Sequence, residues 1–219
     1  MTGKHKKLLL YDNFQTAYNI DAVVANESLQ PLILIEYKYI RYKKHNRDKG
    51  SWLCTAHNAI RRRYSSVRSS IAILAGNWSG SSLAMMKSQQ VNIFLIPFTQ
   101  ICGLLESFDI DFDWNEKDRE TAVEYWEKYS NLTSEQKIGI AHEMIEVIKY
   151  DLEEAISKIL DDSIIREVDR IVVEIYSNIG EVRTFEFKSV EEAIKFLEDF
   201  TFEEIFDPKH SFTLFDKPE

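Results

Sequence analysis

The stretch from Leu32 to Ile40 (LILIEYKYI) sets the first limit on what this chain folds into. Apart from Glu36 and Lys38 it is apolar on both faces, and its branched and aromatic side chains favour a buried β-strand. Side chains alternate between the two faces of a strand, so Glu36 and Lys38 point to the same side. The sequence therefore predicts a buried strand that carries one acid and one base into mostly apolar surroundings.

A second strand is predicted just before it, over Ile20 to Ala25, with turn residues between the two. If the hairpin turns between residues 28 and 29, residues whose numbers sum to 57 lie opposite one another. This register places Asp21 opposite Glu36, and both carboxylates then share one face with Lys38. The hairpin thus predicts a cluster of two acids and one base.

Carboxylates that face each other on neighbouring strands repel unless a positive charge neutralises them. A divalent cation would do so, and Mg²⁺ is commonly held by one or two carboxylates together with water and phosphate oxygens. Lys38 would then lie where it can orient or help to deprotonate a water and stabilise charge on a phosphate. A Glu-x-Lys pair taken alone is more often a solvated ion pair. The apolar surroundings, the second carboxylate and the basic segment that follows favour the catalytic interpretation.

The net charge of −9 hides an asymmetry between the two halves of the chain. Residues 1–100 hold 14 Lys and Arg against five Asp and Glu, whereas residues 101–219 hold 13 against 31. An uncompensated basic region of this kind suits a polyanion such as nucleic acid. The side chains expected to contact DNA are Lys43, Lys44, Arg47 and Lys49 in a basic loop, and Arg61, Arg62 and Arg68 on the helix that follows.

The rest of the pattern predicts an α/β fold, with a mixed sheet flanked by helices. A helix is expected from about Trp52 to Leu74, where apolar residues recur three or four apart, and a buried strand over Val91 to Phe98. The acidic segment 109–117 marks a predicted boundary between a basic core, residues 1–108, and an acidic region, residues 109–219. We expect the acidic region to be mainly helical with one β-hairpin, and to serve dimerisation or specificity.

An Asp, then an apolar strand ending in Glu-x-Lys, then a helix and another apolar strand resembles the PD-(D/E)xK nuclease superfamily, which includes many type II restriction endonucleases. The resemblance covers residues 7–100, and its matching segments are Ile20–Val24, Leu34–Lys38, the helix near Thr55 to Leu74, and Val91–Phe98. It implies a restriction-endonuclease-like core in which Asp21 and Glu36 bind one or two Mg²⁺ ions. Lys38 would be the catalytic lysine.

The sequence departs from the superfamily pattern at Ile20, where many members have proline. Asp12 is the only acid in the sequence ahead of the hairpin, and whether it completes the site stays open. The resemblance implies a Mg²⁺-dependent endonuclease that cleaves double-stranded DNA as a homodimer, without an organic cofactor. The expected compartment is a microbial cytoplasm.

Three other interpretations remain open. One is a repair or recombination nuclease on the same scaffold, and another is a DNA-binding protein whose carboxylates are only structural. A third is an interaction module in which the basic half binds its own acidic tail. Binding that is indifferent to Mg²⁺ would favour the second interpretation, and a strong salt dependence of DNA affinity would count against the third.

Cysteine content and hydropathy argue against a disulfide-stabilised protein, a four-thiolate zinc protein and a membrane-spanning protein. Two cysteines, Cys54 and Cys102, are too few for a disulfide scaffold or a four-thiolate zinc site, and the longest apolar runs are too short to span a bilayer. His57 follows Cys54 by three residues without a second ligand pair at zinc spacing. It is interpreted as a packed residue with a solvent-facing imidazole.

Overall fold

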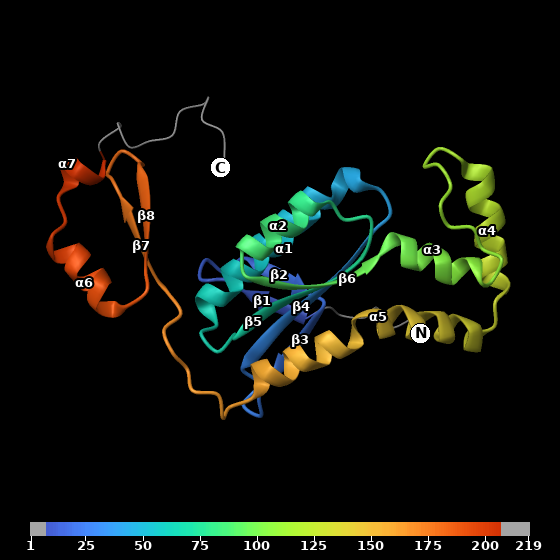
Figure 1. The fold of residues 1–219 in the computed structure, drawn as a ribbon, viewed down its shortest axis with the longest axis horizontal. Coiled ribbons are helices and arrows are strands. Elements are labelled where there is room, and N and C mark those ends of the chain that lie inside the picture. The colour runs from blue at the N-terminus through green and yellow to red at the C-terminus, as the bar shows by residue number, and fades with distance from the viewer. Residues whose placement is uncertain (1–7, 207–219) are drawn as a thin grey trace. The chain divides into compact units, whose positions relative to one another are not determined.

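The computed structural model describes residues 8–206 (Figure 1). Residues 1–7 of the predicted basic core and residues 207–219 of the predicted acidic region lie outside the described part. The chain is a mixed α/β protein that divides into two compact units, Met1–Asp161 and Asp162–Glu219. The first unit contains β1 (Leu8–Tyr11), β2 (Ala17–Ile20), β3 (Ala22–Ala25), β4 (Pro31–Ile40), a 3₁₀ turn (Lys43–His45), α1 (Asn46–Arg63), β5 (Ser69–Gly76), α2 (Gly80–Ser88), β6 (Val91–Pro97), α3 (Phe98–Glu106), α4 (Arg119–Asn131) and α5 (Ser134–Leu160).

A four-stranded mixed sheet in the order β3-β4-β5-β6 forms the centre of the first unit. β3 and β4 are the antiparallel hairpin predicted from the sequence, and β4, β5 and β6 run parallel to one another. The parallel strands are joined by crossovers that contain α1 and α2. β1 and β2 form a separate two-stranded antiparallel sheet.

Helices cover both faces of the four-stranded sheet, with α1 and α2 on one side and α5 on the other (Figure 1). Even-numbered residues of β4 face α1: Leu34 is buried in a cluster with Ile60, and Ile40 in a cluster with Leu53. On the opposite face, β5 and β6 contribute apolar side chains to a cluster with α3, α4 and α5. Residues of β4 that lie between Leu34 and Ile40 on the even face are therefore directed toward α1.

The predicted helix from Trp52 to Leu74 is wrong at both ends. The observed helix, α1, begins earlier, at Asn46, and ends at Arg63. The predicted range extends beyond this end into residues that form strand β5. In the turn between them, the Ser66 hydroxyl donates a hydrogen bond to a β4 carbonyl (2.8 Å), and the Arg68 amide donates another (2.8 Å). β5 lies between two strands and is apolar on both faces, so its side chains also match helical spacing.

The predicted boundary after residue 108 does not separate the compact units, because the first unit continues to Asp161. The acidic segment 109–117 is part of the packing of that unit: Ile110 is buried in one cluster with Ile96 of β6 and Ile140 of α5. The segment therefore contributes the apolar residue Ile110 to the core, which its acidic composition does not indicate. Whether this region serves dimerisation or specificity stays a prediction.

The second unit contains β7 (Ile171–Tyr176), β8 (Val182–Phe187), α6 (Val190–Glu198) and α7 (Phe202–Ile205). The predicted hairpin is present, with β7 and β8 antiparallel. Ser189 caps α6, since its hydroxyl accepts a hydrogen bond from the Glu192 amide (3.2 Å). Within residues 8–206, no helix combines the length and apolarity that crossing a membrane requires.

Candidate active site

The β3–β4 hairpin brings Asp21, Glu36 and Lys38 together. The register pairs Ala22 with Ile35 and Val23 with Leu34, so the predicted pairing of residues whose numbers sum to 57 is confirmed along most of β3. Continuing it by one residue sets Asp21, directly before β3, opposite Glu36. Glu36 and Lys38 share the even face of β4, so all three side chains meet on the side of the sheet that α1 covers.

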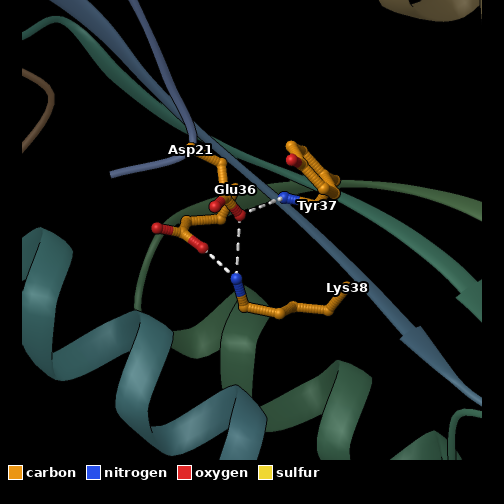
Figure 2. Close-up of polar contacts among 4 residues, drawn as sticks. All are labelled: Asp21, Glu36, Tyr37 and Lys38. Carbon is orange, nitrogen blue, oxygen red and sulfur yellow. Dashed lines mark hydrogen bonds and ion pairs between the residues drawn. The ribbon is translucent and has the colours of Figure 1, made fainter. Parts of the chain in front are cut away.

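One ammonium group bridges the two carboxylates (Figure 2). Lys38 Nζ donates to Asp21 Oδ2 at 2.9 Å and also to Glu36 Oε2. The backbone amide of Tyr37 donates to the same Asp21 oxygen at 3.3 Å. Asp21 is thus fixed from both the side chain and the backbone of β4, which explains how a residue just outside the strand pairing keeps its place.

The carboxylates are nearly covered, whereas the lysine is partly open. The side chains of Asp21 and Glu36 are 2% and 8% exposed, and that of Lys38 is 24% exposed. Charges removed from water to this extent are costly unless they are paired, so the site concentrates two negative charges where solvent screens them poorly. Of the three side chains in the cluster, that of Lys38 is the most exposed to solvent.

Burial and neighbouring charge shift the pKa values of the cluster. Burial is the main cause that raises the pKa of Glu36, Asp21 adds to it, and Lys38 opposes it. For Lys38 burial acts to lower the pKa, but hydrogen bonds and attraction to Glu36 and Asp21 outweigh burial and raise it. Lys38 is therefore held in its charged form, and Glu36 retains a proton more readily than an ordinary glutamate.

Asp12, whose role as a further metal ligand was an open question, uses its carboxylate to stabilise the turn in which it lies. Its Oδ1 accepts hydrogen bonds from the amides of Phe14 and Thr16, both 2.8 Å, and its Oδ2 accepts one from the Tyr18 hydroxyl at 3.2 Å. In the part of the chain that the structure describes, no group of three or more His, Cys, Asp or Glu side chains is arranged to hold a metal.

His57 is placed differently from its sequence interpretation. Its side chain does not face solvent: the residue is 1% exposed, and neither ring nitrogen has a hydrogen-bond partner among residues 8–206. It lies on the buried stripe of α1 between Cys54 and Ile60, opposite the part of β4 that carries the acidic cluster. Burial first, then the charges of Lys38 and Arg61, lower the pKa of His57 to about 4. Its helical spacing with buried neighbours was the sequence signal for this position.

The cations predicted to contact DNA fall into two groups at opposite ends of α1. Arg47 and Lys49, predicted in a loop, belong to the start of the helix, after Lys43 and Lys44 of the 3₁₀ turn. Arg61 and Arg62 belong to its last turn, and Arg68 follows in the turn before β5. At a rise of 1.5 Å per residue, the helix separates Arg47 from Arg61 by about 21 Å.

Some of these cations already have partners in the protein. Lys44 forms an ion pair with Glu116, and Arg47 donates to the Ser81 hydroxyl at 3.4 Å. The guanidinium of Arg68 donates to the carbonyl of Ile159 at 3.1 Å. Lys44 is therefore locally balanced by the acidic segment, contrary to the expectation that nothing nearby compensates the basic region.

Comparison with protein-family models, with curated proteins and with solved structures finds no match for this chain. The geometry of the cluster formed by Asp21, Glu36 and Lys38, and the charges around it, are therefore the observations from which a function can be proposed.

Proposed function

We propose that this chain is a Mg²⁺-dependent endodeoxyribonuclease of the PD-(D/E)xK type, similar to type II restriction endonucleases. The observation that carries the proposal is the convergence of Asp21, Glu36 and Lys38 on one face of a β-hairpin. The order of the surrounding elements supports it: a hairpin, a helix and a further parallel strand follow one another, although that strand is β5 rather than the predicted Val91–Phe98.

The residues present fit a Mg²⁺ site. Asp21 and Glu36 offer hard carboxylate oxygens, and they already share one cation, the ammonium of Lys38. Burial, followed by the neighbouring Asp21, raises the pKa of Glu36, and a bound divalent cation would favour the charged form of both carboxylates. Bound Mg²⁺ would supply a Lewis acid for a water and for the scissile phosphate.

The chain's own groups would have separate roles in phosphodiester hydrolysis. Asp21, held by the Tyr37 amide and by Lys38, and Glu36 would hold the metal. Lys38 stays protonated because its pKa is raised, so it would orient the attacking water and stabilise negative charge on the phosphate rather than act first as a base. The cations at both ends of α1 would contact DNA phosphates on either side of this cluster.

Cleavage of both DNA strands by one active site per chain requires two chains, so the proposal includes a homodimer. A cytoplasmic location in a microbe is part of the same proposal. A non-catalytic DNA-binding protein is the second candidate, and the near-complete burial of both carboxylates favours it, because a purely structural ion cluster needs no access to substrate.

The test is to incubate the purified protein with plasmid and phage DNA, with Mg²⁺ or with EDTA. Discrete fragments that form only with Mg²⁺ would support a sequence-specific endonuclease. Cleavage confined to branched, nicked or single-stranded substrates would move the assignment to a repair or recombination nuclease. Intact DNA of every kind, with binding unaffected by Mg²⁺, would favour the non-catalytic candidate.

A further inference from the structure

A second cluster of cations surrounds an open pocket at the start of β5 and β6. The pocket has a volume of about 570 Å³ and is separate from the acidic cluster. It is lined by Arg61, Arg68, Ser69, Lys87, Gln90, Val91, Asn92 and Ile93. The three cations come from different elements: the end of α1, the turn before β5 and the end of α2.

Two of the three cations in this pocket, Arg61 and Lys87, have no acid beside them among the residues that line it. None of the described residues that line it carries a carboxylate. The guanidinium of Arg61 is half-buried, and within residues 8–206 neither this guanidinium nor the ammonium of Lys87 makes a hydrogen bond or an ion pair. Burial lowers the pKa of Arg61 but leaves it charged at any ordinary pH. Two side-chain cations that share a pocket without an acid attract an anion.

Hydrogen-bond donors complete the wall of the pocket. The Asn92 amide donates to the Ser69 hydroxyl at 2.8 Å, so the hydroxyl oxygen is engaged while the Ser69 hydrogen and the second Asn92 hydrogen remain to be donated. Arg68 is anchored by its bond to the Ile159 carbonyl at 3.1 Å, which fixes a cation at this edge. Guanidinium, ammonium, hydroxyl and amide donors are the groups that bind phosphate oxygens.

We propose that this pocket binds a phosphate group, held by Arg61, Arg68 and Lys87. The sheet register pairs Ser69 with Ile33, three residues before Glu36 on β4, so the pocket begins about 10 Å along the strand direction from the acidic cluster. That distance equals about three nucleotide steps of a DNA strand. Where the phosphate belongs to a nucleic acid backbone, the inference rests on the proposed function. Where it belongs to a free phosphate ester, it does not.

The experiment is a calorimetric titration with inorganic phosphate at constant ionic strength, on wild type, Arg61→Gln, Lys87→Gln and Arg119→Gln. Arg119 is an exposed arginine of α4 outside the pocket, so its variant controls for the loss of one positive charge. Each pocket variant should weaken phosphate binding by about tenfold or more, because a charge-assisted hydrogen bond is lost, while the control keeps the wild-type affinity. Lys87 is exposed, so its variant remains informative if Arg61→Gln fails to fold. Equal affinity in wild type and both pocket variants, or no phosphate binding by wild type, would overturn the proposal.

A second arm distinguishes the sources of the phosphate. If the pocket holds a DNA phosphate, duplex DNA displaces inorganic phosphate, and each pocket variant lowers the salt dependence of DNA affinity by about one unit of slope. If phosphate binding is lost in the variants while DNA affinity is unchanged, the pocket serves a free phosphate ester. Wild-type protein that binds phosphate in this pocket but cleaves no DNA with Mg²⁺ would retain the pocket and reject the nuclease.

Discussion

Replacing Lys38 with methionine keeps an unbranched side chain but removes the ammonium that Asp21 and Glu36 share. At an effective dielectric constant of about 20, opposite charges at the 2.9 Å distance of the Lys38–Asp21 contact attract by about 6 kcal/mol before desolvation is subtracted. Removing one partner of a buried ion pair typically costs about 3–5 kcal/mol. Because the Lys38 side chain is 24% exposed, we expect the lower end, about 3 kcal/mol at neutral pH. For a unit of this size the melting temperature falls by about 6–12 °C.

The loss should shrink in acid. Burial, with help from Asp21, raises the pKa of Glu36 above its unfolded value, so protonated Glu36 stabilises the folded state at low pH and this contribution is lost as the pH rises through the folded pKa. Without Lys38 that pKa rises further. Acidification therefore recovers part of the deficit of Lys38→Met relative to wild type.

The assay is thermal unfolding of both proteins at about pH 8 and about pH 5, followed by circular dichroism. Lys149→Met is the control, since Lys149 forms an exposed ion pair with Glu146 at 2.7 Å on α5, and its loss should have little effect at either pH. A Lys38→Met protein as stable as wild type at about pH 8, or a deficit that grows in acid, would refute the reasoning.

Three further predictions concern His57, Gly76 and Asp12 of the first unit. Burial, followed by Lys38 and Arg61, lowers the pKa of His57 from 6.5 to about 4, so about 3 kcal/mol of stability present above pH 6.5 is lost as the pH falls toward 4. A His57→Leu variant should lose this part of the acid sensitivity in the same melts, and an unchanged pH profile would contradict the assignment. Gly76 has φ +98°, and an added Cβ would lie 2.0 Å from the Ile40 carbonyl oxygen, so Gly76→Ala should cost more than about 3 kcal/mol in urea unfolding. Gly139→Ala, in an open part of α5, should instead gain about 0.5–1 kcal/mol, and similar values for the two variants would disprove the clash. For Asp12, burial acts to raise the pKa, but hydrogen bonds from Thr16, Phe14 and Tyr18 lower it, so Asp12→Ala should melt below wild type at neutral pH and approach it in acid. Equal melting temperatures at neutral pH would show that these bonds stabilise nothing.

The hairpin and its acidic cluster could be predicted because local rules determine them. Strand alternation puts Glu36 and Lys38 on one face, and the turn length fixes the register that brings Asp21 opposite. Both rules depend only on residues close together in the sequence.

The elements after the hairpin were less predictable because their packing depends on distant residues. β5 is buried between β4 and β6, and a strand that is apolar on both faces carries no period of two to distinguish it from a helix. The start of α1 was missed because Arg47 and Lys49 resemble a solvated loop, and no side chain caps the helix there.

The phosphate pocket could not be read from the sequence at all. Lys87 is isolated among polar and apolar residues, and it meets Arg61 only because two parallel crossovers return the chain to the same end of the sheet. Arg61 and Arg68 were expected to lie on one helix. They line the same pocket instead from a helix end and a turn.

The most direct test of the proposed active site is the single-turnover cleavage rate of plasmid DNA with Mg²⁺, measured below the melting temperature of every variant used. We predict that Lys38→Met and Glu36→Gln lower the rate by at least about a hundredfold while DNA affinity stays within a few-fold of wild type, because the first removes the ammonium beside the reacting phosphate and the second weakens the hold on the metal. Lys117→Met, an exposed lysine away from the cluster, should cleave at the wild-type rate. Wild-type cleavage by folded Lys38→Met would contradict the assignment of Asp21, Glu36 and Lys38 as the active site.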